Sequence, residues 1–201
     1  MTANASELAP GFFTTSVKWF QAANNSAIKL KTHTHSEKPM LHSVLLSKMI
    51  DSPVGHLHLV ASDRGLCAVN FAAGKQKLRT EGIEHSDDNA TLMRAEKQLA
   101  EYFAGKRKSF DIRLDMRGTI FQLKAWQQLQ KIPYGETISY GEQAKRVGDV
   151  KKARAVGMAN GRNPISIIVP CHRVIGATGA MTGFGGGIST KEFLLKHEAS
   201  H

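Results

Sequence analysis

The residues with the clearest capacity for covalent chemistry are a cysteine and a histidine that are neighbours in the sequence, Cys171 and His172. They lie between two apolar runs, residues 167–169 and 174–175, and Arg173 follows them directly. A thiol reacts as its thiolate, and a neighbouring base or cation favours that form. The pattern therefore indicates a nucleophilic cysteine.

The same segment also fits a purely structural cysteine. Free cysteine is among the most buried residue types, and side chains that are adjacent in sequence seldom face each other. Pro170 restricts the backbone before Cys171, so the thiol is held rigidly in either case. The local pattern leaves both alternatives open, and the elements around the thiol must decide between them.

Composition limits the class of protein. The chain has 201 residues, of which 41% are hydrophobic, which suits one large domain or two small ones with a real core. Lys and Arg number 27 against 17 Asp and Glu, a net charge of +10 that favours a polyanionic partner. No apolar run approaches the roughly 20 residues that span a bilayer, so we expect no membrane association.

Cysteine use and the first residues predict a cytoplasmic protein. Cys67 and Cys171 are 104 positions apart, which excludes a local CxxC or metal-binding pair. Two isolated cysteines are typical of a reducing compartment. The first residues also lack a basic segment followed by an apolar one, the pattern of a secretory signal.

The amino-terminal half predicts an extension followed by a small α/β domain. Residues 1–39 are rich in Ala, Asn, Ser, Thr and Lys without a sustained period and are predicted to be a flexible extension, with an amphipathic partner-binding segment at 17–30 as an alternative. Met40 is a candidate start of the biological protein. The predicted domain spans residues 40–117. It is expected to hold three antiparallel strands at 42–49, 55–61 and 65–71, and a helix at 91–103. Residues 110–115 are expected to form one more strand or an extended linker.

Several histidines of this half raise the question of a metal site. His56 and His58 share one face of a predicted strand, and His33, His35 and His42 lie upstream. They lack an accompanying cysteine or carboxylate pattern of metal ligands. We therefore predict solvated or core histidines and no bound metal.

The carboxy-terminal half, residues 118–201, has a helix-turn-helix pattern. Thr119 can cap a helix that runs to Gln130, and Ser139 can cap a second helix, 140–147, that a glycine turn separates from a third at 150–160. Basic side chains concentrate in this region, at Lys145, Arg146, Lys151, Lys152, Arg154 and Arg162. Position and charge together indicate contact with nucleic acid.

The third of these helices is poor in bulky side chains. Ala153, Ala155, Gly157 and Ala159 leave a flat surface from which Arg154 projects. Such a surface suits contact with the shape of DNA. It also suits close packing in a core, and both can hold on opposite faces of the helix.

The last elements are a glycine-rich loop and a closing helix. Residues 179–187 are predicted to be a flexible loop that presents the single aromatic side chain of Phe184, and residues 191–198 a helix. The loop lacks the GxxxxGK[ST] pattern, which argues against a nucleotide-binding P-loop.

At this point the residues resemble a known family. The run from Pro170 to Ile175 resembles the active-site motif of the methylated-DNA–protein-cysteine methyltransferases, also called O6-alkylguanine-DNA alkyltransferases. The resemblance spans residues 119–198, and 41–115 resembles more loosely the variable amino-terminal domain of that family; residues 1–39 lie outside it. Further matching segments are 118–122, 132–137, 139–140, 153–157, 163–164 and 191–195.

The fold that the resemblance implies is α+β. It has a small ribonuclease H-like α/β domain with an antiparallel sheet, followed by a mainly helical domain with a helix-turn-helix.

The resemblance implies a direct-reversal DNA repair protein. Cys171 resembles the acceptor that takes the alkyl group from guanine O6 in one irreversible step, with O4-methylthymine as a second expected substrate. His172, through a bridging water, and Glu198 resemble the relay that deprotonates the thiol. The protein would be consumed in a single turnover, and no cofactor is implied.

Other positions resemble the family's supporting residues. Asn163 resembles the residue that orders the turn beneath the active site, Lys191 one that supports the network, and Tyr140 the group that assists departure of guanine and helps to turn the nucleotide out. Arg154 resembles the arginine that enters the duplex through the minor groove. The implied DNA-contacting set is Arg154, Tyr140, Ala153, Lys152 and Gly157, and the implied base pocket is Val174, Phe184 and Gly185.

Differences from the family and rival functions complete the predictions. Phe184 stands where many relatives have tyrosine, and the zinc-binding and sensor cysteines of some relatives have no counterpart, so we predict no structural zinc.

The predicted partner is double-stranded DNA with an alkylated guanine, bound by a monomer. The rivals are a non-catalytic lesion-binding module, a helix-turn-helix regulator and a hydrolase that uses Cys171, His172 and Asn163.

Overall fold

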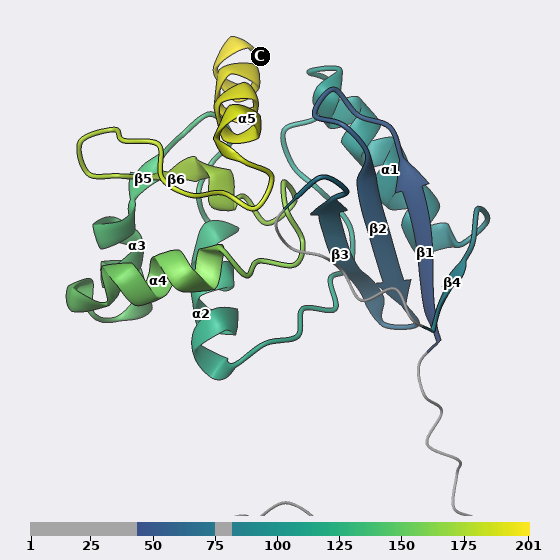
Figure 1. Cartoon of the computed structure of the whole chain (residues 1–201), viewed down its shortest axis with the longest axis horizontal. Coiled ribbons are helices and arrows are strands. Elements are labelled where there is room, and N and C mark those ends of the chain that lie inside the picture. The colour runs from purple at the N-terminus through teal and green to yellow at the C-terminus, as the bar shows by residue number, and fades with distance from the viewer. Residues whose placement is uncertain (1–43, 75–81) are drawn as a thin grey trace, which may run out of the picture. The chain divides into compact units, whose positions relative to one another are not determined.

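A four-stranded sheet forms the amino-terminal part of the fold (Figure 1), and the computed structural model describes residues 44–74 and 82–201. The strands are β1 (Leu45–Ile50), β2 (Leu57–Ser62), β3 (Gly65–Phe71) and β4 (Ile83–His85), in the order β3-β2-β1-β4. β1, β2 and β3 pair antiparallel, which confirms the predicted meander. The predictions for residues 1–39, for Met40 and for His33, His35 and His42 lie outside the described residues.

The fourth strand was not predicted from the sequence. β4 pairs parallel to β1 over three residues, and two of them, Glu84 and His85, are exposed. A strand this short shows no alternation of apolar and polar residues. The sheet is therefore mostly antiparallel, with one parallel edge strand.

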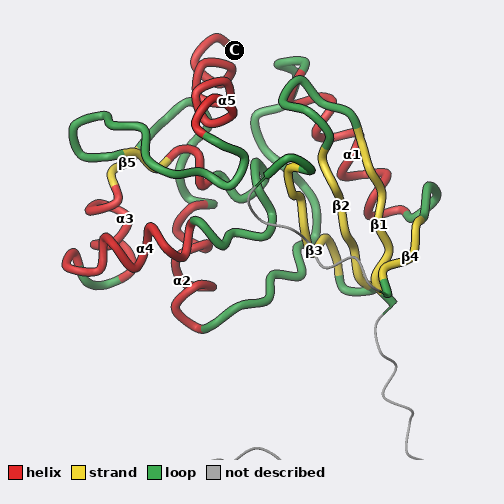
Figure 2. Tube along the Cα trace, in the orientation of Figure 1, coloured by secondary structure: helices red, strands yellow, loops and turns green. Residues whose placement is uncertain are grey.

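One long helix, α1 (Ala90–Phe103), packs against this sheet (Figure 2). Asn89 caps its first turn, because the side-chain oxygen accepts hydrogen bonds from the backbone of Thr91 and Leu92. Most of the apolar face that the sequence predicts is buried, and Leu99 and Tyr102 have no exposed surface, but Met93 is exposed and Phe103 is half-buried. The ring of Tyr102, in the last turn of α1, thereby lies inside the protein.

The segment at 110–116 connects the two halves as an extended linker. Its side chains alternate, since Phe110, Ile112, Leu114 and Met116 are half-buried. A single bridge pairs Leu114 with Leu66 on β3. Of the two structures that the alternation of apolar and polar residues predicted, a strand or an extended linker, the segment forms the linker. Its apolar side chains are half-buried along one face.

The carboxy-terminal part is mainly helical, as predicted. Its helices are α2 (Ile120–Leu129), α3 (Tyr140–Val147), α4 (Ala153–Asn160) and α5 (Ile188–Ser200). Thr119 and Gln122 form a capping box on α2, and Ser139 caps α3. None of the described helices is long and apolar enough to cross a membrane.

The helix predicted at 150–160 is two elements. Residues Val150–Lys152 form a 3₁₀ turn, and α4 begins only at Ala153. The side chain of Asp149 accepts a hydrogen bond from the backbone N–H of Lys151 and so caps the turn. Gly148, with φ of 121°, allows the sharp turn between α3 and this segment.

Buried amides tie the three helices α2, α3 and α4 together. The side-chain amides of Gln143 and Asn160 bond to each other at 2.7 and 3.1 Å, and Gln143 also donates to the carbonyl of Ala125 on α2. Trp126 on α2 donates its indole N–H to the carbonyl of Ala159 at 2.9 Å. The helix-turn-helix is thereby fixed to the core by satisfied polar groups.

This network makes a prediction about stability. Asn160→Ala would leave the side-chain carbonyl of Gln143 buried without its donor, so we expect the free energy of unfolding to fall by about 1–3 kcal/mol. Urea unfolding measures this, with Lys196→Ala on the exposed face of α5 as the control that should change it by less than about 0.5 kcal/mol. Equal losses in both variants would contradict the assigned role of the network.

Candidate active site

The cysteine of the apolar motif lies in a tight turn that Asn163 holds in place. Cys171 begins a 3₁₀ turn, Cys171–Arg173, directly after Pro170. The side-chain N–H group of Asn163 donates to the carbonyl of Val169 at 2.7 Å and lies 3.2 Å from the Sγ atom of Cys171. The carbonyl oxygen of Asn163 accepts from the backbone of Ile165 at 3.1 Å. One amide therefore both orders the turn and points a donor at the thiol.

Burial keeps the thiol protonated at rest. Only 6% of Cys171 is exposed, and this burial raises the pKa of the thiol, while the hydrogen bond from Asn163 and the charge of Lys191 act in the opposite direction. Lys191 is fully buried, and its Nζ atom donates to the carbonyl of Val174 at 2.6 Å. A thiolate that forms here has a donor and a cation ready to receive it.

Glu198, from the last turns of α5, is the carboxylate of the site. Its side chain is 1% exposed and accepts five hydrogen bonds from four residues. Oε1 accepts from Nε2 of His172 at 2.7 Å, and Oε2 accepts from Nε of Arg173 at 2.9 Å. The other donors are Nη2 of Arg173 at 3.0 Å, the hydroxyl of Tyr102 at 2.8 Å and the backbone N–H of Gly135 at 3.1 Å.

Burial and this carboxylate shift the pKa of His172 in opposite directions. Burial alone would raise the pKa of Glu198, but the hydrogen bonds and charges of His172 and Arg173 outweigh it and lower the pKa to about 2. Burial lowers the pKa of His172, although Glu198 opposes this, so the imidazole is held neutral. Because Nε2 donates to the carboxylate, Nδ1 carries the lone pair. Nδ1 is buried and has no hydrogen-bond partner among the described residues.

Tyr140 reaches the same region from the start of α3. A short parallel pairing of β5 (Ile138–Ser139) with β6 (Val174–Ile175) places this helix beside the cysteine motif. The Tyr140 hydroxyl accepts a hydrogen bond from Thr182 at 2.9 Å, and burial raises its pKa. Gly157 of α4 faces the ring, because a Cβ atom built there would lie 3.5 Å from it. A Cβ atom at this position would therefore be in ordinary van der Waals contact with the ring of Tyr140.

Phe184 is buried, so the prediction of a loop that presents this ring is wrong. The ring is 8% exposed and packs edge to face on Phe71 of β3, with centroids 5.5 Å apart, and on His172 at 6.4 Å. An apolar ring beside an apolar strand end gains from burial, and the loop sequence alone does not reveal this contact. Of the other pocket residues predicted, Val174 is buried and Gly185 is half-buried.

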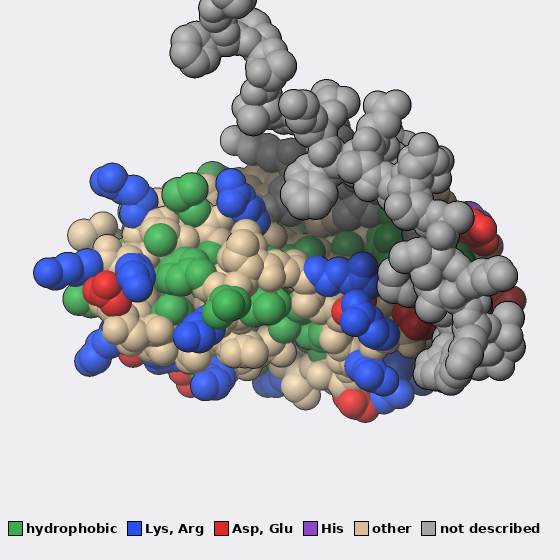
Figure 3. Space-filling model, turned by 90° about the horizontal axis from the view of Figure 1, so that it is seen from below, with side chains coloured by type: hydrophobic (Ala, Val, Ile, Leu, Met, Phe, Trp, Pro, Cys, Tyr) green, Lys and Arg blue, Asp and Glu red, His purple; other side chains and the backbone are tan. Residues whose placement is uncertain are grey.

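Four of the five residues predicted to contact DNA lie on α4 and the turn before it, and the fifth, Tyr140, begins α3. Lys152 and Arg154 are exposed, Ala153 and Gly157 are half-buried, and the opposite face is buried through Val156, Ala159 and Asn160. The buried face thus has the core packing that the sequence allowed, while DNA contact by the exposed face stays a prediction. Figure 3 shows basic side chains around apolar ones at the end of the molecule that carries α3 and α4.

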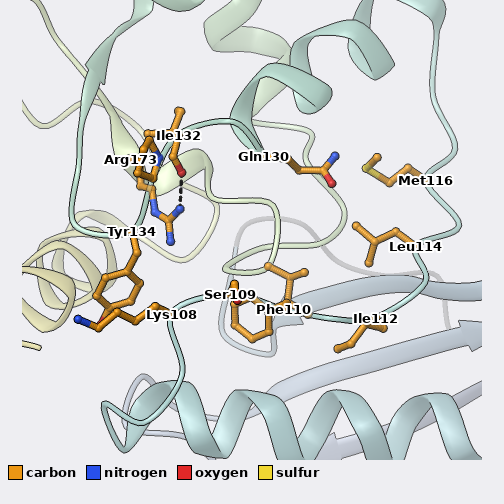
Figure 4. A pocket seen from close by; sticks show the side chains of 12 residues that line it. Lys108, Ser109, Phe110, Ile112, Leu114, Met116, Gln130, Ile132, Tyr134 and Arg173 are labelled. Atoms are coloured by element: carbon orange, nitrogen blue, oxygen red, sulfur yellow. Dashed lines mark hydrogen bonds between the residues drawn. The ribbon is translucent and has the colours of Figure 1, made fainter.

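The sequence did not reveal two contributors to the site. Tyr102 was predicted only as part of an apolar helix face, and Arg173 only as a cation near the thiol. Instead, Arg173 is 6% exposed and binds both oxygens of Glu198 and the carbonyl of Ile132 (Figure 4). It lines a cavity of about 570 Å³, together with Tyr134 and Phe110, whose lining does not include Cys171.

The described residues do not gather a set of metal ligands. Within residues 44–74 and 82–201, no group of three or more His, Cys, Asp or Glu side chains could hold a metal ion. His56 is exposed and pairs with Asp51 at 2.6 Å.

The low pKa of Glu198 makes a prediction about stability in acid. Its folded pKa of about 2 lies below the usual 4.5, so the stability it contributes is fully present above pH of about 4.5 and is lost as the pH falls toward 2. We expect Glu198→Gln to lower the free energy of unfolding at neutral pH by about 3 kcal/mol, and this gap to narrow as the pH falls. Urea unfolding across that range measures the gap, with the exposed Glu192→Gln as the control. A gap that does not change with pH would contradict the prediction.

Comparison with known proteins agrees with this geometry over nearly the whole described chain. Residues 45–116 match the family described as 6-O-methylguanine DNA methyltransferase, ribonuclease-like domain, and residues 120–200 match its DNA binding domain. The sheet-containing amino-terminal part and the helical carboxy-terminal part therefore each match a domain of this family.

Individual relatives give the same result. A methylated-DNA–protein-cysteine methyltransferase of Methanosarcina acetivorans is 52% identical over 153 residues, which cover 76% of this chain and 97% of the relative. The solved structure of the Mycobacterium tuberculosis O6-methylguanine methyltransferase is 47% identical with a TM-score of 0.72, over 78% of this chain and 93% of that one. A structure of Mycobacterium tuberculosis OGT in complex with DNA matches with a TM-score of 0.71 at 47% identity, over 77% and 93% of the two chains. The chain therefore belongs to the methylated-DNA–protein-cysteine methyltransferase family.

Proposed function

We propose that this protein repairs DNA by transferring the alkyl group of O6-methylguanine to the Sγ atom of Cys171. The observation that carries the proposal is the buried Nδ1 atom of His172, which has no hydrogen-bond partner among the described residues, while Nε2 of the same ring is bound to an ionised Glu198. His172 directly follows the acceptor cysteine in the chain. A thiol that burial keeps protonated needs such a base before it can attack carbon.

The transfer balances without a cofactor. The thiol proton passes through a water to His172, the Sγ–carbon bond forms, and the bond between the alkyl carbon and O6 breaks with its electron pair remaining on the base. Tyr140, whose hydroxyl stays protonated because its pKa is raised, donates a proton to the departing guanine. The proton held on His172 then leaves to solvent and Tyr140 regains one from solvent, so both side chains return to their neutral forms. The products are guanine in DNA and a thioether on Cys171, so each molecule acts once. O4-methylthymine presents the same bond and is the second substrate proposed.

The remaining predicted residues stabilise this step. Asn163 donates to Sγ and Lys191 places a cation near it, so both favour the thiolate over the thiol. Val174 directly follows the cysteine turn, and Val174, Phe184 and Gly185 are proposed to contact the base. The hydroxyl of the family's tyrosine is absent at position 184, so its hydrogen bond to the substrate is not part of this proposal.

The DNA is proposed to bind along the exposed face of α4. The small side chains Ala153 and Gly157 let the helix enter a narrow minor groove, while Lys152 neutralises phosphate. Arg154 would fill the space in the duplex left by the target nucleotide, which must leave the stack to reach a buried thiol. One protein molecule supplies every group that this step uses, which supports action as a monomer.

Two broader predictions are also proposed. The division into residues 40–117 and 118–201 is supported by the two family matches, which meet between residues 116 and 120. A cytoplasmic location is supported by the two free cysteines, Cys67 and Cys171, which suit a reducing compartment.

The direct test of the function is mass spectrometry. After incubation with a duplex oligonucleotide that contains one O6-methylguanine, we expect the Cys171 peptide to gain about 14 Da, the mass of a methyl group replacing a hydrogen, with at most one equivalent transferred. The Cys67 peptide should stay unmodified, and Cys171→Ala should show no transfer. Repair that continues past one equivalent, or that survives Cys171→Ala, would sink the proposal.

A second prediction separates DNA engagement from chemistry. We expect Arg154→Ala to slow single-turnover transfer from duplex DNA by roughly 10- to 100-fold, because the extruded state loses its support. The same variant should react with free O6-benzylguanine within about twofold of the wild-type rate, because a free base needs no extrusion. Lys97→Ala, an exposed cation on α1, is the matched control and should leave both rates unchanged. An equal loss on both substrates would place Arg154 in the chemical step and contradict the assignment.

A further inference from the structure

A residue of the amino-terminal domain touches the carboxylate of the proposed relay. The hydroxyl of Tyr102 donates to Oε1 of Glu198 at 2.8 Å, across 96 residues of sequence. The same oxygen accepts from His172 at 2.7 Å and from Arg173 at 3.0 Å. Tyr102 therefore acts on the atom that holds the imidazole.

Packing fixes the phenol in this position. Tyr102 has no exposed surface, and its ring contacts those of Phe103, Phe110 and Tyr134 at centroid distances of 5.3, 5.6 and 6.1 Å. Its backbone carbonyl accepts a hydrogen bond from Nε2 of His197, one residue before Glu198. The last turn of α1 and the last turns of α5 are thus joined by two contacts, one through backbone and one through side chain.

The phenol remains a donor at every working pH. Burial and the charge of Glu198 raise the pKa of Tyr102 far above its usual value. It therefore stabilises the charge of the carboxylate without taking part in proton transfer. Its effect on the reaction has to pass through Glu198 and His172.

We propose that Tyr102 is a positioning residue for alkyl transfer, through which the amino-terminal domain holds Glu198 in the orientation that fixes the imidazole of His172. The inference rests on the relay of the proposed function. It assigns to the amino-terminal domain a part in the chemical step in addition to its part in the fold.

The expected effect of losing this hydroxyl has a definite direction. Without the phenol, the charge of Glu198 is less neutralised, so the imidazolium form of His172 is favoured and its pKa rises. Neutral His172 is the form that accepts the thiol proton, so the acid limb of the pH–rate profile moves to higher pH. The loss of one of three donors on Oε1 also loosens the imidazole and lowers the rate at the plateau.

The structure provides a matched control in the neighbouring tyrosine. The hydroxyl of Tyr134 is buried and has no hydrogen-bond partner among the described residues. Its ring packs against that of Tyr102 (ring centroids 6.1 Å apart) and lies close to Arg173 (Figure 4). Tyr102→Phe and Tyr134→Phe therefore delete the same group from adjacent rings, one bonded to Glu198 and one not.

The experiment is the single-turnover rate of methyl transfer to Cys171 from a duplex oligonucleotide with one O6-methylguanine, measured on the full chain across pH. For Tyr102→Phe we expect the acid limb of the pH–rate profile to move to higher pH by about half a pH unit to one pH unit. We also expect the rate at the plateau of the profile to fall roughly 3- to 10-fold. Tyr134→Phe should superimpose on the wild type. 3-Fluorotyrosine at position 102 keeps the ring and its packing but is a stronger donor, so it should move the limb to lower pH.

The outcomes separate the two claims. A wild-type protein that forms no S-methylcysteine at position 171 would refute the proposed function itself. If the wild type reacts but the pH–rate profile of Tyr102→Phe superimposes on it, the role of Tyr102 is overturned and the proposed function stands. The same holds if the profile of Tyr134→Phe shifts as much as that of Tyr102→Phe. If Tyr102→Phe does not fold, the protein with 3-fluorotyrosine at position 102 provides the test. An acid limb of its pH–rate profile that lies at the same pH as in the wild type would overturn the inference.

Discussion

The buried carboxylate of Glu198 is the constraint on which the rest of the site depends. A charge taken out of water costs several kcal/mol unless hydrogen bonds and opposite charge replace the lost solvent. Glu198 receives five hydrogen bonds, and its donors come from α1, from the loop after α2 and from the cysteine turn. Three segments that are distant in sequence must therefore be in place before the charge is satisfied, and the fold and the site form together.

The sheet edge supplies the second constraint. β3 pairs on its outer side with the linker at Leu114 and with the carboxy-terminal part at Ile165. The second pairing fixes the backbone two residues after Asn163, whose amide orders the turn at Cys171. The amino-terminal domain thus sets the geometry of the thiol from one side, as Tyr102 sets that of Glu198 from the other.

Local signals in the sequence were sufficient for most elements and for the acceptor, while long-range contacts were not. The helix starts at Thr119 and Ser139 were predictable because a cap depends on residues within one turn. The role of Tyr102 was not, because its ring belongs to an apolar helix face and its hydroxyl finds a partner 96 positions away. Phe184 was misjudged for the same reason, since the strand that buries it lies in the other half of the chain.

In the proposed transfer, the arrangement of charges supports a single reaction at the buried thiol. Deprotonation creates a thiolate beside Lys191 and an imidazolium beside Glu198, so each new charge meets an opposite charge that is already in place. No reorganisation is needed at the moment of attack. After transfer the sulfur is a neutral thioether, which neither accepts the proton back nor offers a leaving group. The same burial that protects the resting thiol then seals the alkylated product.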